Sequence, residues 1–179
     1  MFFTVPGLHN SGEDHWQTIW EKTYPQHFRR LQQQRWDTPD KDTWVTAMEK
    51  QLNAYPNEEI VLMGHSVGCA AIAHWVAAYG KQIKGALLVA PSDVDRPNYP
   101  SYITGFAPMP LQPLPFKTIV VASTNDHVVD LDRAAHFASC WKSSLHVLEN
   151  AGHIEGKYGY GTWPEGLALL QQLDPEFIL

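Results

Sequence analysis

The stretch that decides the fold is IVLMGHSVG, residues 60–68. Its four apolar residues have the composition of a buried strand, and the alanine-rich segment 69–79 that follows has the composition of a helix. A serine at the turn between them, here Ser66, takes a strained backbone that projects its hydroxyl outward. The residues two before and two after such a serine approach each other closely, and both are glycine here, Gly64 and Gly68. The pattern predicts a nucleophilic serine.

Length and composition indicate a single folded domain spanning residues 1–179. Apolar residues make up 44% of the chain and charged residues 18%, which is typical of a globular protein rather than a disordered one. The net charge of -6 provides no attraction to nucleic acid or to an anionic membrane. We therefore expect neither nucleic-acid nor membrane partners.

The cellular location is predicted from three features. The start of the chain lacks the basic and apolar segments of a signal peptide. No apolar run approaches the roughly 18 residues of a membrane span, and two cysteines are too few for a disulfide framework. A cytoplasmic location is the expectation.

Strand and helix patterns alternate along the chain. Apolar runs predict strands at residues 2–5, 28–36, 60–63, 86–90, 119–122 and 145–148. Helix starts are predicted at two capping boxes (Ser11 with Asp14, Thr162 with Glu165), at Thr38-Pro39, after Ser66 and near Leu131. Right-handed crossovers between such strands produce a parallel sheet with helices on both faces. The expected fold class is α/β, a three-layer α/β/α sandwich with a mostly parallel sheet of about six strands.

Residues 91–116 interrupt this alternation. The segment holds seven prolines and little periodicity. Long loops without secondary structure are usually functional or disordered. Because the segment leaves the carboxyl end of a strand beside the serine strand, we expect a cover that faces the substrate, with a proline-stiffened surface connection as the alternative.

Three reactive side chains follow strands of the predicted sheet: Ser66, Asp126 and His153. Ligands of open parallel sheets bind at the carboxyl ends of the strands, where these residues would meet. A serine hydroxyl needs a base to remove its proton, and neutral imidazole can do so near pH 7. A carboxylate on the far ring nitrogen orients the imidazole. Asp93 and Asp95, which follow the fourth strand, are the alternative acids.

These features together resemble the α/β-hydrolase superfamily: the motif around Ser66, the order Ser, Asp, His, and the alternating pattern. The opening Val5-Pro6-Gly7 and the segment SGEDHW at 11–16 are more narrowly similar to small YdeN-type serine hydrolases, which include the retinoblastoma-binding-protein-9-like enzymes. This resemblance implies a minimal hydrolase fold without a cap domain. The chain has no L-x-C-x-E segment, so a retinoblastoma-type partner is not inferred.

The superfamily resemblance also implies an oxyanion hole. Its two donors would be the amide of Val67, which follows the nucleophile, and an amide from the loop after the first strand. Leu8 is the candidate for the second donor and His9 the alternative. Amides preset around the oxyanion contribute roughly 3–4 kcal/mol each to catalysis.

Five side chains are candidates for lining the site, His9 and four others. Trp16 and Trp163 flank nearby loops and could form an apolar wall. His15 is expected about one turn into the first helix, where packing is its usual role. His65 is expected to be structural, because adjacent residues in a sharp turn point apart. The chain has no H-E-x-x-H motif and no paired C-x-x-C, so a dedicated metal site is not expected. No cofactor is expected either, because cleavage of an ester bond requires none.

The sequence therefore predicts a serine hydrolase that cleaves a small ester, amide or thioester through an acyl-enzyme. One alternative is an acyltransferase that uses the same three residues. The other is an interaction module that keeps the hydrolase architecture without turnover.

Overall fold

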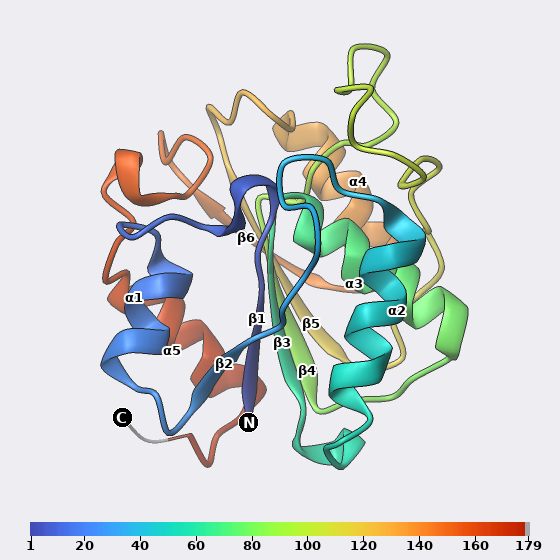
Figure 1. Cartoon of the computed structure of the whole chain (residues 1–179). Coiled ribbons are helices and arrows are strands. Elements are labelled where there is room, and N and C mark those ends of the chain that lie inside the picture. The colour runs from blue at the N-terminus through green and yellow to red at the C-terminus, as the bar shows by residue number, and fades with distance from the viewer. Residues whose placement is uncertain (178–179) are drawn as a thin grey trace.

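A six-stranded sheet runs through the centre of the molecule (Figure 1), in a computed structural model that describes residues 1–177. The strand order is β2-β1-β3-β4-β5-β6, and every neighbouring pair is parallel. The strands are β1 (Phe2–Val5), β2 (Phe28–Arg30), β3 (Val61–His65), β4 (Gly85–Val89), β5 (Lys117–Ser123) and β6 (Ser144–Leu148). The predicted parallel α/β sheet is confirmed.

Within residues 1–177, five α-helices cover the two faces of the sheet. Figure 1 shows α1 (Trp16–Thr23) and α5 (Pro164–Leu173) on one face. The other face carries α2 (Lys41–Leu52), α3 (Val67–Tyr79) and α4 (Leu131–Trp141). Three short 3-10 helices, Leu8–Asn10, Asn57–Glu59 and Gly156–Tyr158, lie in the connections. The result is the three-layer sandwich that the alternating pattern predicts, and no cap domain interrupts it among residues 1–177.

Each face of the sheet has its own hydrophobic core. Alternate side chains of one strand point to opposite faces. In β3, Leu62 packs with α2, α3 and α4, while Val61 and Met63 pack with α1 and α5. All three side chains are fully buried. A strand covered on both faces has no polar side, which explains the continuous apolar runs in the sequence.

Several predicted element boundaries are wrong. The strand expected over 28–36 covers only Phe28–Arg30, at the edge of the sheet. The helix expected at Thr38-Pro39 begins at Lys41, because the carboxylate of Asp40 accepts from the amide of Thr43 and caps it.

Neither predicted capping box forms. His15 caps α1, and the Ser11 hydroxyl instead donates to the side-chain oxygen of Gln17 at 2.6 Å. Trp163 precedes α5 in a left-handed conformation, and Pro164 supplies the first helical residue. Proline suits that position because its φ is already helical and it has no amide hydrogen to leave unpaired.

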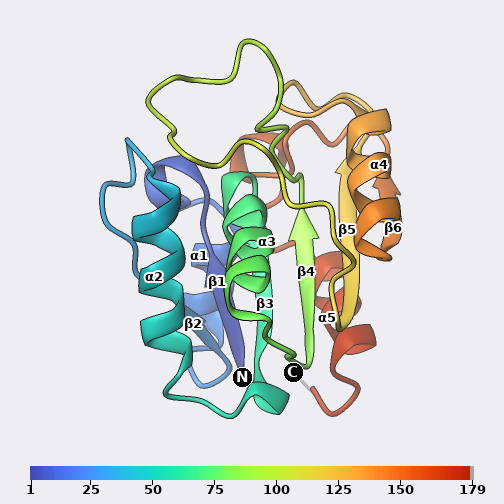
Figure 2. The same cartoon turned by 90° about the vertical axis from the view of Figure 1, so that its right-hand side faces the viewer.

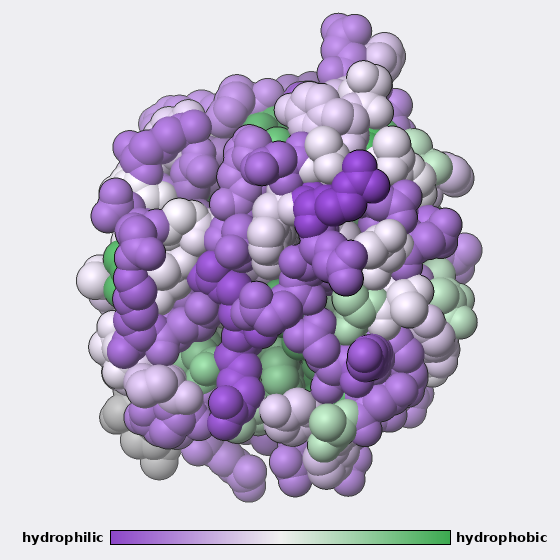
Figure 3. All heavy atoms as spheres, viewed as in Figure 1, coloured by the Kyte–Doolittle hydropathy of each residue, from purple (hydrophilic) through white to green (hydrophobic). Residues whose placement is uncertain are grey.

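The molecular surface in the view of Figure 3 is dominated by hydrophilic residues. Within residues 1–177, no helix has both the length and the apolar character that a membrane crossing requires.

Candidate active site

Ser66 occupies a strained turn between β3 and α3. Its backbone has φ 55° and ψ −124°, a conformation that non-glycine residues adopt at a cost. The flanking glycines make the turn possible. A Cβ on Gly68 would overlap the carbonyl oxygen of Val5, and one on Gly64 would lie 3.1 Å from the backbone nitrogen and Cα of Cys69. Sterics therefore explain both glycines of the motif.

Asp126 and His153 meet at the same end of the sheet, after β5 and β6. His153 Nδ1 lies 2.8 Å from Asp126 Oδ2 and 3.0 Å from Oδ1. The amide of Val128 donates to Asp126 Oδ1 at 2.8 Å, which fixes the carboxylate. His153 is only 6% exposed. This carboxylate can hold the imidazole in the tautomer that leaves Nε2 free to accept a proton.

The two alternative acids are engaged elsewhere. Arg133 donates to Asp93 at 2.9 Å and to Asp95 at 3.1 Å, through the same terminal nitrogen. The Asp93 pair raises the pKa of the Arg133 guanidinium. Among the three candidate acids, only Asp126 is hydrogen-bonded to His153.

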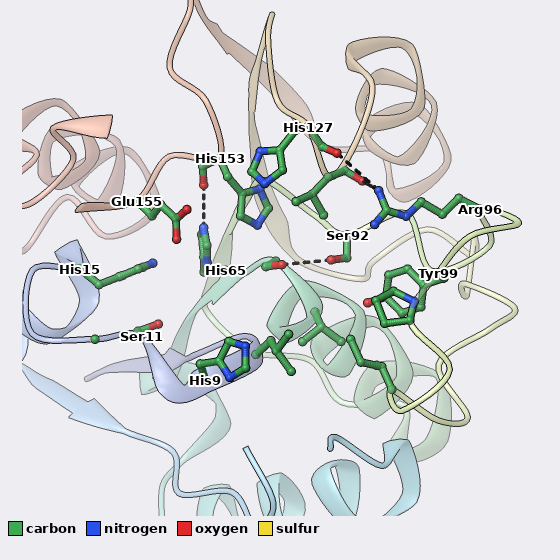
Figure 4. A pocket seen from close by; sticks show the side chains of 17 residues that line it. His9, Ser11, His15, His65, Ser92, Arg96, Tyr99, His127, His153 and Glu155 are labelled. Atoms are coloured by element: carbon green, nitrogen blue, oxygen red, sulfur yellow. Dashed lines mark hydrogen bonds between the residues drawn. The ribbon is translucent and has the colours of Figure 1, made fainter. Parts of the chain in front are cut away.

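The Ser66 hydroxyl rests against Ser92. The two Oγ atoms are 3.0 Å apart (Figure 4), and no hydrogen bond within residues 1–177 joins Ser66 to His153. Both side chains nevertheless line one cavity of about 330 Å³. In serine hydrolases this hydrogen bond is often long or misaligned until substrate binds.

The cavity is built by loops at the carboxyl ends of the strands. Its lining includes the serine turn, the segment after β1, the loop after β4 and the loops after β5 and β6. Besides Ser66, the lining residues are Leu8, His9, Ser11, Gly12, His15, His65, Val67, Ser92, Arg96, Tyr99, Pro100, Ile103, His127, Val128, His153 and Glu155.

Two backbone amides at the cavity have no acceptor within residues 1–177. Val67 opens α3, so its N–H lacks an intrahelical partner. No turn or loop carbonyl within residues 1–177 accepts from Val67 or Leu8. The His9 amide donates to the Trp36 carbonyl at 3.1 Å, which removes it as a free donor. Leu8 and Val67 therefore have the free N–H groups that an oxyanion hole needs.

Gly7, which precedes Leu8, packs closely against the serine turn. A Cβ at this position would lie 3.0 Å from both Ser66 Cβ and the His65 carbonyl. We expect Gly7→Val to push the Leu8 amide away from the serine turn and to lower kcat by about 10²–10³-fold, the effect of losing one oxyanion donor. Steady-state ester hydrolysis together with thermal melting checks this. Near-normal kcat would show that the Leu8 amide is not used.

Two predictions about the cavity wall are wrong. Trp16 is fully buried and donates from Nε1 to the Ile154 carbonyl at 3.1 Å, away from the cavity. Trp163 is 4% exposed and stacks on Trp20, with the ring centroids 5.7 Å apart. Both indoles belong to the core between the sheet, α1 and α5.

His65 has a structural role and also lines the cavity. Its buried Nε2 donates to the carbonyl of His153 at 2.8 Å and so anchors the loop that carries the imidazole. Burial is the main cause that lowers the pKa of His65, with smaller contributions from His15 and His153. A neutral ring with a single donor matches this hydrogen bond.

Five histidines, including His15, contribute to the cavity. The expectation that His15 lies one turn inside the helix is wrong, because it is the N-cap. No group of three or more His, Cys, Asp or Glu in the described part of the chain is arranged to hold a metal ion.

The first part of the proline-rich segment 91–116 lies over the carboxyl edge of the sheet, where a substrate-facing cover is expected, and the later part runs down beside α3 to the start of β5 (Figure 2). Tyr99, Pro100 and Ile103 line the cavity. Arg96 donates to the Val128 carbonyl at 3.0 Å, and Trp141 donates to the Pro110 carbonyl at 2.7 Å. These bonds join the segment to the loop after β5 and to α4.

Sequence reasoning missed several residues of the cavity. Ser92 lies just beyond the carboxyl end of β4, so the rule that selected Ser66, Asp126 and His153 could have found it. Tyr99 lies in a segment without periodicity, and no pattern in the sequence orients it.

Comparisons with known proteins agree with this architecture. Residues 2–172 match the model of the serine hydrolase family. A putative YdeN-like hydrolase from Pectobacterium atrosepticum is 34% identical, with a TM-score of 0.85 over 100% of this chain and 92% of that one. The ydeN gene product of B. subtilis is 17% identical, with a TM-score of 0.75 over 96% and 97% of the two chains.

An esterase from Rhodococcus shares the fold at 16% identity, with a TM-score of 0.65 over 96% of this chain and 88% of the other. Among functionally curated proteins, no relative was found. The family match spans nearly the whole chain and includes the serine turn, the loop of Asp126 and the loop of His153. The chain belongs to the serine hydrolase family and has the α/β-hydrolase fold of YdeN-type enzymes.

Proposed function

We propose that this serine hydrolase cleaves a small carboxylic ester through an acyl-enzyme, with Ser66 as nucleophile, His153 as base and Asp126 as orienting acid. One observation carries the proposal: the His153–Asp126 pair, at 2.8 Å, opens onto the same cavity as the strained Ser66. Strain at a functional turn and a buried imidazole–carboxylate pair are typical of an activated nucleophile.

Acylation begins when the Ser66 hydroxyl turns from Ser92 toward His153. Its Oγ attacks the substrate carbonyl carbon while Nε2 of His153 takes the proton. Asp126 stabilises the imidazolium that forms. The negative charge on the former carbonyl oxygen is held by the Leu8 and Val67 amides, each contributing roughly 3–4 kcal/mol. Collapse of this intermediate breaks the ester bond, and the leaving alcohol takes the proton from His153.

Deacylation repeats these steps with water. His153 removes a proton from the water as its oxygen attacks the acyl carbon, and the second tetrahedral intermediate uses the same two amides. The proton then returns to Ser66 Oγ as the carboxylic acid leaves. Every proton transfer uses His153, so the cycle needs no cofactor.

An ester is the favoured substrate because its alcohol leaves more readily than an amine, and the same groups can act on amides or thioesters. Transfer of the acyl group to another acceptor would use the same intermediate. Product analysis with competing alcohols or amines distinguishes the two, since a transferase yields new esters or amides in place of the free acid.

A fluorophosphonate probe tests the proposal directly, because it phosphonylates only an activated serine. We expect the wild-type protein to be labelled on Ser66 and the Ser66→Ala variant to remain unlabelled, as read by intact mass and peptide mapping. Ser92→Ala is the matched control, since it removes the neighbouring hydroxyl and keeps the nucleophile. Well-folded wild-type protein that resists labelling would favour the non-catalytic interaction module instead.

A further inference from the structure

The His15 ring forms part of the cavity wall and has a defined tautomer. Its Nδ1 accepts from the amide of Gln17 at 3.2 Å, which caps α1. A ring nitrogen that accepts a hydrogen bond carries no proton, so in the neutral ring the hydrogen lies on Nε2. Nε2 is thus a hydrogen-bond donor.

This donor has no partner in the protein. His15 is only 6% exposed, and within residues 1–177 no atom accepts from its Nε2. Figure 4 shows the ring pointing into the cavity toward His65. The centroids of the two rings are 4.5 Å apart, and the rings meet edge to face. Buried donors are almost always hydrogen-bonded, so an unpartnered one in a substrate cavity indicates a group that a ligand satisfies.

The lowered pKa of His15 makes its ring an uncharged hydrogen-bond donor. Burial is the largest of the causes that lower the pKa of His15 to about 3, and Arg30 and His153 add to it. The ring is therefore uncharged near neutral pH and offers no ionic attraction to a carboxylate.

A nearby acid restricts the ligand further. The carboxylate of Glu155 lines the same side of the cavity (Figure 4) and pairs with Lys157 at 2.6 Å. A substrate carboxylate beside His15 would be repelled by Glu155. A neutral oxygen, such as a ketone, amide carbonyl, ether or hydroxyl, meets no such penalty.

We propose that His15 is a specificity residue whose Nε2–H binds a second, neutral oxygen acceptor on the substrate, so that the natural substrates are oxo-, alkoxy- or hydroxy-substituted esters. The inference rests on the proposed ester hydrolysis and adds the substrate class to it. A site built around a polar donor discriminates against analogues that lack the acceptor, because the donor is then left buried and unpaired.

Matched ester pairs test the inference. In the acyl arm, p-nitrophenyl 4-oxopentanoate is compared with p-nitrophenyl pentanoate. In the alcohol arm, 4-oxopentyl butanoate is compared with pentyl butanoate. Each kcat/KM is divided by the rate constant of hydroxide-catalysed hydrolysis of the same ester. In the arm that reaches His15, we expect the oxo ester to be favoured on the order of 10-fold.

Two variants separate the donor from the helix cap. His15→Asn keeps a side-chain oxygen that can accept from the Gln17 amide but has no group at the position of Nε2. The oxo preference is expected to fall to about 1 in this variant. His15→Gln extends an N–H group toward the position of Nε2 and is expected to restore part of the preference. Thermal melting verifies that both variants fold.

Two outcomes would overturn the inference while the hydrolase proposal stands. One is equal normalised rates within both wild-type pairs. The other is an oxo preference that persists in His15→Asn. If none of the four esters undergoes hydrolysis that depends on Ser66, the proposed function itself fails.

Discussion

The His153→Ala variant is expected to lose ester hydrolysis by a factor on the order of 10⁵–10⁶ in kcat. The imidazole lines the same cavity as Ser66, and its Nδ1 lies 2.8 Å from the buried carboxylate of Asp126. Without it the Ser66 hydroxyl keeps its proton during attack, and the leaving alcohol receives none. Steady-state kinetics with a p-nitrophenyl ester measures the loss.

The loss of activity is informative only if the His153→Ala variant still folds. Asp126 keeps its hydrogen bond from the Val128 amide in the variant, so we expect a moderate fall in melting temperature and no collapse. His136→Ala is the matched control, because His136 is an exposed residue of α4 outside the cavity. An unfolded His153→Ala protein would assign His153 a structural role, and a folded variant with wild-type kcat would remove it from catalysis.

The second large effect is expected from Asp126→Asn, about 10⁴-fold in kcat. The side-chain oxygen of the new asparagine is needed by the Val128 amide, which now donates to Asp126 Oδ1. Its NH₂ group then faces His153 Nδ1 and donates to it. That nitrogen becomes an acceptor, the ring proton moves to Nε2, and Nε2 can no longer take the proton of Ser66.

Asp130→Asn provides the comparison for this variant. Asp130 is exposed at the start of α4, and its side chain forms no capping hydrogen bond. It undergoes the same chemical change four residues away and should retain wild-type activity. An Asp126→Asn enzyme that retains more than about a tenth of wild-type kcat would show that the carboxylate is not the orienting acid.

Much of the fold could be predicted because apolar runs and tight turns are local features. The runs in β3, β4 and β5 are continuous since both faces of the sheet are covered, and this signal does not depend on distant residues. Helix starts were less predictable. Residues of both predicted capping boxes take other partners: Ser11 bonds to Gln17, and Glu165 bonds to Nε2 of His146 at 2.8 Å.

The candidate site, like the fold, could be predicted from the sequence only in part. Ser66 could be identified from its neighbours, because Gly64 and Gly68 are required by contacts within a few residues and by the adjacent β1. The tryptophans could not be placed, because an indole near a loop in sequence can point either to the cavity or to the core. Trp16 and Trp163 pack in the core on α1 and α5.

The sequence by itself determined the parallel α/β sheet, the serine turn and the order of Ser66, Asp126 and His153, since strand periodicity and turn sterics act over short stretches of chain. Only the tertiary structure decided which acid contacts His153, that Ser66 rests on Ser92, and that the Nε2–H of His15 faces the cavity without a partner. These depend on how loops from different strands meet at one edge of the sheet. Contacts between segments that are distant along the chain leave no local pattern in it.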